Sequence, residues 1–207
     1  MPLGPAASSP FIPGTTGWTA DDLDDPQIER QWENGAYEII EGVLTTMAPA
    51  YYVGGKALFR LMCEITARVG QAAGSFCPGA EVVIDQTWVI RADAVFLTPD
   101  QEARQTQAAL AAGAIDPNRK RILIPPLLII ESISPGHEMH DRRTKRRWYA
   151  EFGVANYWLF DAFARSLQCL VLENGVYRED AAGSGEQDVR PSLFPGLVVP
   201  LKGLWAS

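Results

Sequence analysis

The stretch Leu127-Leu-Ile-Ile-Glu-Ser-Ile-Ser-Pro135 decides the fold, because it contains the most hydrophobic strand-like run of the chain. Its first four residues are all apolar, so a strand formed here would present apolar side chains on both faces, as the central strand of a covered sheet does. Pro125-Pro126 precede the run and Glu131 ends it. The sequence therefore predicts a buried central strand with a carboxylate at its end.

Strand and helix signals surround this run on both sides. The β-prone runs 37–40 and 43–47 flank Glu41-Gly42, which is a two-residue hairpin signal. Apolar residues recur at helical spacing from Lys56 to about Val69, with Gly70 or Gly74 as the end of that helix. We expect further strands at 80–84, 88–97, 156–160 and 166–172, a short helix opened by Thr98-Pro99, and a helix from residue 138 or 141 to 152. This order predicts an α/β domain with a mixed central β-sheet flanked by helices.

The chain has 207 residues, which is enough for one domain with a substantial core. Its first residues are rich in Pro, Gly and Ser and lack the basic start and continuous apolar run of a secretion signal. We expect a flexible N-terminal tail over residues 1–18 and a single domain over residues 19–207. Thr19 is the expected N-cap of the first helical turn.

Composition limits the class and the location of the protein. The formal net charge of -7 argues mildly against a surface coated with nucleic-acid-binding cations, but it allows positive charge confined to one groove. Three cysteines without a CxxC pair argue for free thiols in a reducing compartment. No apolar run approaches the length of about 20 residues that a membrane-spanning helix needs. We expect a cytoplasmic protein that does not span a membrane.

Three charged residues stand where the local pattern calls for apolar ones. Asp93 interrupts the apolar strand pattern of residues 88–97, and Glu131 directly follows the central strand. Lys145 lies on the same helical face as Trp148, Tyr149 and Phe152. A charged group in such a place must be paired, neutralised or bound to a metal. Taken singly, the two acids could be solvated or salt-bridged residues at strand ends, and the lysine could extend to solvent from the rim of the core.

Together these residues predict a metal site. Asp93 and Glu131 supply the hard oxygen ligands that Mg²⁺ prefers, and the backbone carbonyl of Ser132 could add a third. Mg²⁺ or Mn²⁺ held there would lower the pKa of a bound water and offset the charge of a phosphate. Lys145 would orient that water or stabilise the developing oxyanion.

At this point the sequence resembles the PD-(D/E)XK, or restriction-endonuclease-like, nuclease superfamily, and within it the bacterial branch labelled putative restriction endonucleases. The resemblance runs from about Tyr37 to Trp205 and is most specific between Leu128 and Asp161. Its markers are Tyr37-Glu-Ile-Ile-Glu-Gly42, Met47-Ala-Pro49, Glu81, Asp93, Leu128-Ile-Ile-Glu-Ser-Ile-Ser-Pro135, Asp141-Arg-Arg-Thr-Lys145, Tyr149, Gly153-Val154, Tyr157-Trp-Leu-Phe-Asp161 and Leu193-Phe-Pro-Gly-Leu197.

The resemblance implies a restriction-endonuclease-like core, metal ligands at Asp93 and Glu131, and Lys145 as the motif's lysine. In the commoner motif the lysine lies two residues after the acid, where this chain has Ile133. Glu81 and Asp141 are possible accessory acids.

The chain also departs from the family pattern. Ala92 replaces the motif's proline, and Gly54 stands where many relatives have a histidine. Ser134-Pro-Gly-His137 replaces the more usual Ser-Pro-Ser-Thr. None of these changes removes Asp93, Glu131 or Lys145.

Two other motifs are weaker than they look. His137-Glu-Met-His140 has the spacing i, i+3, not the i, i+4 of a zinc protease helix, and it reads better as the solvated start of a helix. Gly54-Gly55-Lys56 lacks the other residues of a phosphate-binding P-loop. The stretch from His137 to Glu151 carries five bases and three acids; it is either a solvated helix face or a phosphate-contacting edge beside the site.

The sequence thus favours a Mg²⁺-dependent DNA endonuclease. The alternative is a domain of the same fold that binds nucleic acid or protein without turnover. Enzymes that break both strands usually pair two sites, so we expect a homodimer, as the resemblance also implies.

Overall fold

The computed structural model describes residues 11–34, 36–47, 51–113, 121–133 and 140–205. Its helices are η1 (Ala20–Asp24), α1 (Pro26–Glu33), α2 (Tyr52–Val69), η2 (Gln71–Ala73), α3 (Pro99–Ala111), η3 (His140–Lys145), α4 (Arg146–Phe152) and η4 (Leu201–Gly203). Its strands are β1 (Tyr37–Ile40), β2 (Val43–Thr46), β3 (Ser75–Asp85), β4 (Trp88–Leu97), β5 (Arg121–Ile122), β6 (Leu128–Ser132), β7 (Asn156–Asp161), β8 (Ser166–Glu173), β9 (Val176–Ser184), β10 (Asp188–Val189) and β11 (Val199–Pro200).

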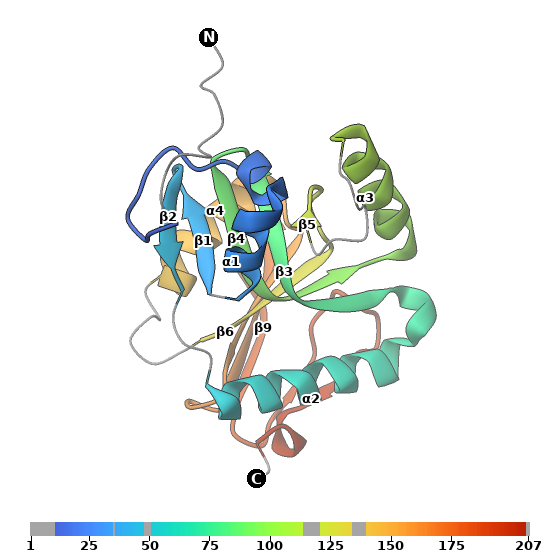
Figure 1. Cartoon of the computed structure of the whole chain (residues 1–207). Coiled ribbons are helices and arrows are strands. Elements are labelled where there is room, and N and C mark those ends of the chain that lie inside the picture. Colours follow the sequence, from blue (N-terminus) through green and yellow to red (C-terminus); the bar gives the residue numbers. More distant parts are fainter. Residues whose placement is uncertain (1–10, 35, 48–50, 114–120, 134–139, 206–207) are drawn as a thin grey trace.

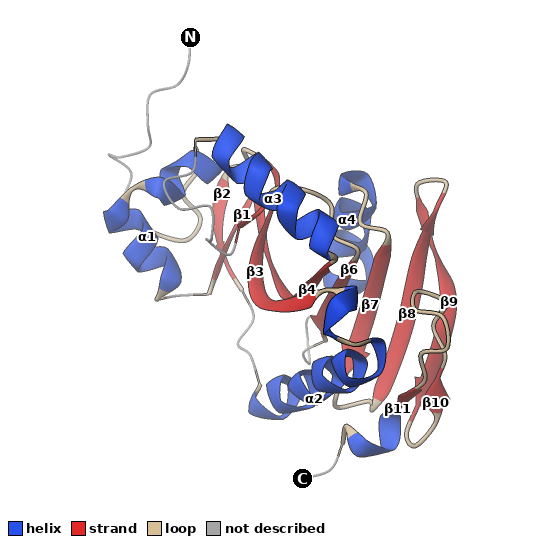
Figure 2. Cartoon of the chain, turned by 90° about the vertical axis from the view of Figure 1, so that its right-hand side faces the viewer, coloured by secondary structure: helices blue, strands red, loops and turns tan. Residues whose placement is uncertain are grey.

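A mixed sheet forms the centre of the molecule (Figures 1 and 2). Its main path is β2-β1-β4-β6-β7-β8-β9, and β3 pairs with both β4 and β5. The β6–β7 and β3–β5 pairs are parallel, whereas the other pairs of this sheet are antiparallel. The predicted α/β class with a mixed central sheet is confirmed.

Strand β6 is the central strand that the sequence predicts. Leu128 and Ile130 point into a core cluster with Leu61 and Ile65 of α2. Ile129 points to the other face, into a cluster with Tyr149 of α4. Because helices cover both faces, the apolar side chains of β6, Leu128 to Ile130, are fully buried. Glu131 shares the face of Ile129, which is the face of α4.

Strand β4 meets three other strands, and this arrangement leaves an opening in the sheet. β3 runs along one edge of β4 for nearly its whole length. On the other edge, β1 pairs at Val89 only, and β6 pairs only from Ala94 to Phe96. The backbone around Arg91 and Asp93 therefore lies between two neighbouring strands that have diverged.

The local predictions near this opening agree with the structure. The hairpin turn places Glu41 and Gly42 at φ 53° and 72°, the left-handed conformations that a two-residue turn requires. Helix α2 begins at Tyr52, four residues before the predicted Lys56, and ends at Gly70. η3 and α4 together form the predicted helix before Gly153, which has φ 90°. The long strand β9, which pairs with β8, was not predicted.

The described part of the expected tail is packed against the domain. Trp18 is fully buried, and Phe11 contacts it edge to face. Gly14 donates a backbone hydrogen bond to Leu44 of β2, and Thr16 forms a bridge with Val43. The packed domain thus begins by Phe11, earlier than the predicted boundary at residue 19, and the rest of the expected tail lies outside the described residues.

Candidate active site

The opening between β1 and β6 is filled by two charged side chains that satisfy the backbone of β4. The Arg91 N–H donates to Glu38 Oε1 at 3.2 Å. The Arg91 carbonyl accepts from Lys145 Nζ at 3.4 Å. A buried backbone group needs a partner, and here side chains take the place of a neighbouring strand. The opening therefore fixes Glu38 and Lys145 at one point of the sheet.

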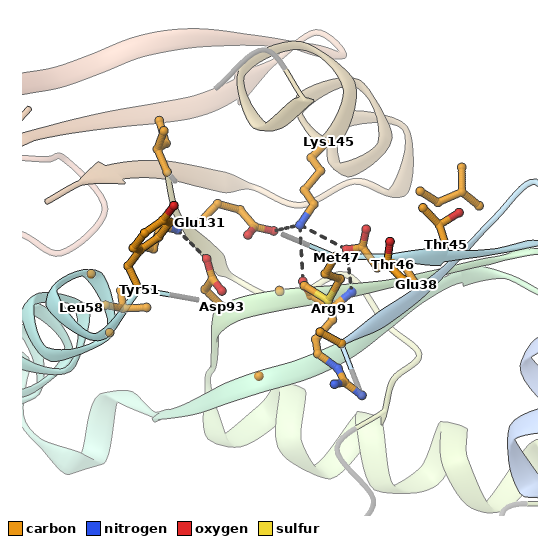
Figure 3. Close-up of a pocket in the computed structure, with 18 of the residues that line it drawn as sticks. Glu38, Thr45, Thr46, Met47, Tyr51, Leu58, Arg91, Asp93, Glu131 and Lys145 are labelled. Atoms are coloured by element: carbon orange, nitrogen blue, oxygen red, sulfur yellow. Dashed lines mark hydrogen bonds and ion pairs between the residues drawn. The ribbon is translucent and has the colours of Figure 1, made fainter. Parts of the chain in front are cut away.

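Lys145 is the centre of this charged cluster (Figure 3). Its ammonium lies 3.2 Å from Glu38 Oε1 and 3.2 Å from Glu131 Oε1. The side chain is only 4% exposed, as the prediction of an inward-facing lysine required. Lys145 is the last residue of the π-helical turn η3, and its neighbours Trp148 and Tyr149 are buried on the same side. A π-helical turn shifts the face that a helix presents and is frequent at functional sites.

Glu131 is held by two donors. Tyr149 Oη donates to Glu131 Oε1 at 2.6 Å, beside the 3.2 Å bond from Lys145. Glu131 is 2% exposed, so a charge on it depends on these partners. Burial is the largest cause that raises the pKa of Tyr149 well above 10, and the neighbouring Glu131 carboxylate raises it further. Tyr149 therefore remains a neutral donor at physiological pH.

Asp93 lies next to Glu131 and is poorly compensated. Its Oδ2 accepts a 2.7 Å hydrogen bond from the Ser132 N–H. Burial raises the pKa of Asp93 above its ordinary value, and the nearby Glu38 carboxylate adds to that effect. The Lys145 charge and hydrogen bonds from Ser132 and with Glu131 lower the pKa but do not offset burial. A carboxylate in this state gains from a nearby cation.

These groups line a cavity of about 470 Å³. Asp93, Glu131, Lys145 and Glu38 form its polar side, and Tyr51 and Leu58 of the α2 region lie opposite. Among the described residues of the lining, three carboxyl groups lie near one ammonium, and Arg91, which also lines the cavity, pairs with Glu81. The excess negative charge is complementary to a divalent cation.

The donor set fits a hard cation better than zinc. Among the described residues, no group of three or more His, Cys, Asp and Glu side chains converges at metal-binding distance. Mg²⁺ needs only one or two carboxylates and keeps several waters, which two acids and a backbone carbonyl can satisfy. The Ser132 N–H points toward Asp93, and the carbonyl of a strand residue projects to the same edge as its N–H. Asp93, Glu131 and Ser132 are therefore suited to hold Mg²⁺ or Mn²⁺.

The two accessory acids are placed differently. Glu81 does not line the cavity; its carboxylate accepts from Trp32, Arg91 and Arg121. The backbone of Asp141 lies in η3, but its side chain is outside the described residues. The same holds for the side chain of His140, and His137 with the rest of residues 134–139 is not described, so the motif His137-Glu-Met-His140 stays a sequence pattern.

Two of the three departures from the family pattern fall at the site, and the third, at residues 134–137, lies outside the described residues. Gly54 is buried in the cavity wall, and a Cβ at this position would lie 3.2 Å from Ser132 Oγ. The residue that replaces the relatives' histidine is therefore next to the predicted ligand Ser132. Ala92 is fully buried in β4 and also lines the cavity.

Glu38 is the site residue that sequence reasoning did not assign. Its place in Tyr37-Glu-Ile-Ile40 looks like an ordinary polar position of a hairpin, and only the pairing of β1 with β4 brings it to Lys145. The sequence signal that could have identified Glu38 is its position in the family marker Tyr37-Glu-Ile-Ile-Glu-Gly42. Tyr149 was likewise predicted to lie on the apolar face of the helix, and its hydrogen bond to Glu131 was not predicted.

The fold belongs to the restriction-endonuclease-like class. A model of the Uma2 family, described as "Putative restriction endonuclease", matches residues 26–202, and the chain belongs to this family. Membership implies a hydrolase that acts on nucleic acids. The predicted family and fold are confirmed.

A solved structure supports the fold assignment. The chain is similar to a putative nuclease belonging to DUF820 from Anabaena variabilis, with a TM-score of 0.64 and 16% sequence identity. The likeness covers 83% of this chain and 90% of that chain. A comparison with curated proteins gives no match. Within the described residues, no helix is long and apolar enough to cross a membrane.

Proposed function

We propose that this protein is a metal-dependent DNA endonuclease whose centre is Asp93, Glu131 and Lys145. The observation that carries the proposal is the buried contact of the Lys145 ammonium with Glu38 and Glu131, beside the Asp93 carboxylate that accepts from the Ser132 N–H. A fold has no need of excess buried negative charge, which costs free energy unless a cation or proton offsets it. A site for a divalent cation accounts for that excess, and the family membership supports a phosphodiester substrate.

The residues of the candidate site have separate roles in the proposed reaction. Asp93 and Glu131 would hold Mg²⁺ or Mn²⁺ with the Ser132 carbonyl, and the cation would lower the pKa of water and offset phosphate charge. Lys145 supplies an ammonium beside Glu131 that orients the attacking water and stabilises negative charge on the phosphate. The buried Tyr149 hydroxyl donates to Glu131 Oε1 and would hold the carboxylate in place for the cation.

Glu38 acts through Lys145 as a positioning residue. It holds the ammonium 3.2 Å from its own carboxylate and accepts from the Arg91 N–H, which fixes the lysine relative to β4. The same contact keeps the ammonium within 3.2 Å of Glu131.

Metal-dependent cleavage tests the proposal directly. Purified protein is incubated with plasmid and branched DNA in Mg²⁺, Mn²⁺ or EDTA, and the rate is compared with that of Glu131→Ala. We expect cleavage only with metal and a loss of at least about 10³-fold in the variant, because the metal and its water are misplaced. Glu131→Gln, which keeps the Tyr149 hydrogen bond, controls for folding. No cleavage by wild-type protein under any of these conditions, with no metal binding by calorimetry, rejects the enzyme.

The second candidate function is a binding domain of the same fold without turnover. Gly54 in place of the relatives' histidine and the acidic net charge favour it. Its signature is DNA binding that is independent of Mg²⁺ and unchanged by Glu131→Gln. The complete Asp93, Glu131 and Lys145 set favours the enzyme.

We further propose that the enzyme works as a homodimer in the cytoplasm. Enzymes that break both strands usually pair two sites, and the described residues supply one. No disulfide joins Cys63, Cys77 and Cys169, which fits a reducing compartment. Sedimentation velocity gives the mass in solution, and a monomer that cuts both strands at once contradicts the dimer.

A further inference from the structure

A second cavity of about 400 Å³ lies beside the candidate active site. Lys56 and Arg60 of α2 and Arg165 of the β7–β8 turn line it together with the rings of Tyr52 and Trp205. We call this the basic groove. Among the described residues, the lining includes three cations and no acid, in a protein whose formal net charge is -7. Positive charge is therefore concentrated here against the overall balance.

An aromatic ridge separates the basic groove from the catalytic cavity. Tyr51 and Phe163 both line the catalytic cavity and contact each other edge to face, with ring centroids 5.4 Å apart. Their neighbours in sequence, Tyr52 and Ala162, line the basic groove. Residues from the N-terminal turns of α2 thus line both cavities. A chain lying in the groove would reach the catalytic cavity across this ridge.

The aromatic side chains are placed to offer ring faces. Tyr52 is 82% exposed, which is unusual for a tyrosine at the start of a helix that packs on the core. Trp205 is stacked on Phe160 with an interplanar angle of 14°, and its Nε1 donates to the Gly185 carbonyl. One aromatic residue is thus exposed and the other is held rigidly at the opposite wall.

We propose that the basic groove binds an unpaired nucleic-acid strand and leads it to the catalytic cavity, an inference that rests on the proposed nuclease function. The three cations contact phosphates, and bases stack on Tyr52 and on the ridge of Tyr51 and Phe163. Sites for single strands combine a positive groove with aromatic stacking platforms in this way. A duplex hides its base faces within the stack, so the aromatic rings select an unpaired strand. The preferred substrate is therefore a single strand, or a duplex with a single-stranded extension next to the cut.

A second copy of the chain is a less suitable occupant. A two-fold contact through this surface places the same three cations on both sides, where they repel each other. A polyanion, in contrast, is attracted by all three cations.

The test measures binding separately from cleavage. Fluorescence anisotropy records binding of a labelled oligothymidylate of about 12 nucleotides, a typical single-strand site size, and of a duplex of equal length. Ca²⁺ replaces Mg²⁺ to fill the metal site without turnover. The variants are Lys56→Gln with Arg165→Gln, and Tyr52→Ala. The matched control is Arg178→Gln with Arg190→Gln, which removes two exposed charges outside the groove.

We expect wild-type protein to bind the single strand more tightly than the duplex. The groove double variant should bind the single strand about tenfold more weakly. The slope of log affinity against log salt concentration should become shallower by roughly 0.7 per lost phosphate contact. Tyr52→Ala should weaken single-strand binding about tenfold with little effect on the duplex. The control pair should change both affinities equally and by less.

Three results overturn the groove assignment. They are equal affinities for the two double variants, a duplex bound more tightly than the single strand, and a dimer in sedimentation velocity that the groove variants convert to monomer. Cleavage assays keep the two proposals distinguishable. Normal cleavage with unaltered strand preference in the groove variants rejects the groove alone, whereas normal strand binding without any cleavage rejects the nuclease alone.

Discussion

Two clusters of buried charge lie on either side of Arg91, and they differ in their balance. In the first, Glu81 accepts from Trp32, Arg91 and Arg121, and Arg121 also pairs with Asp24 at 2.6 Å. Two acids meet two bases there. In the second, the Lys145 ammonium faces Glu38 and Glu131, with Asp93 beside them. Three acids meet one base.

The difference separates a structural ion-pair network from the candidate active site. The Glu81 cluster joins η1 and α1 to β3, β4 and β5, and each oxygen of Glu81 has a donor. Such a network holds elements together and has no need of a further cation. The Lys145 cluster lines a cavity and keeps Asp93 with a raised pKa, which is the pattern of a site prepared for a ligand. Charge balance thus distinguishes two acids, Glu81 and Glu131, that look alike in the sequence.

The largest expected effect comes from removing the base that, in the described part of the chain, contacts both Glu38 and Glu131. Lys145→Met leaves Glu38 and Glu131 buried without their shared cation, so we expect a loss of about 3–5 kcal/mol in the free energy of unfolding. Urea denaturation at neutral pH measures it. The double variant with Glu38→Gln should recover part of that loss, because one unpaired carboxylate is then neutral. A Lys145→Met protein as stable as wild type contradicts the buried pairing.

In the first cluster we expect a smaller loss of stability and no large loss of cleavage. Glu81→Gln should lower the free energy of unfolding by about 1–3 kcal/mol, because it weakens charge-assisted hydrogen bonds from both arginines. Metal-dependent cleavage should stay within a few-fold of wild type at a temperature where the variant is folded. Glu131→Gln measured in parallel is the matched comparison. A loss of cleavage in Glu81→Gln as large as in Glu131→Gln would assign Glu81 to the chemistry after all.

The smallest effect is a gain of stability from Asp93→Asn. Burial raises the pKa of Asp93, so the folded protein binds a proton at this group more tightly than the unfolded chain does. The stability linked to that proton is present below the ordinary carboxyl pKa of 3.8 and is lost as pH rises through the folded value.

Asparagine keeps an uncharged side chain at every pH. In EDTA we therefore expect Asp93→Asn to have a higher melting temperature than wild type at neutral pH and an equal one in acid. Adding Mg²⁺ should raise the melting temperature of wild type more than that of the variant. Thermal unfolding as a function of pH, with and without metal, records both effects. A variant that is less stable than wild type at neutral pH in EDTA contradicts the raised pKa.

Much of the fold could be read from the sequence, because its signals are local. The apolar run 127–130 required a covered central strand, and β6 is that strand. Glu41-Gly42 specified a hairpin, and the spacing within α2 specified a helix with one buried face. Strand β9 was missed because its alternation is weak: among its residues only Tyr177 is fully buried, and the others are exposed or partly exposed.

The site was accessible to the sequence only in part. Asp93, Glu131 and Lys145 were visible because each breaks a local apolar pattern, and helical geometry alone predicted that Lys145 faces inward. Glu38 breaks no such pattern, since one acid in a short edge strand is ordinary. Its role depends on the divergence of β1 from β6 along β4, which no local signal encodes.

The sequence by itself thus determined the central strand, the helices that cover it and the three exceptions to its apolar patterns. These follow from short-range periodicity and from the free-energy cost of burying a charge. Only the tertiary structure decided which acids meet Lys145 and which meet the arginines. That choice depends on strand pairing between residues far apart in the chain, which brought Glu38 to the site and tied Glu81 to Arg91 and Arg121.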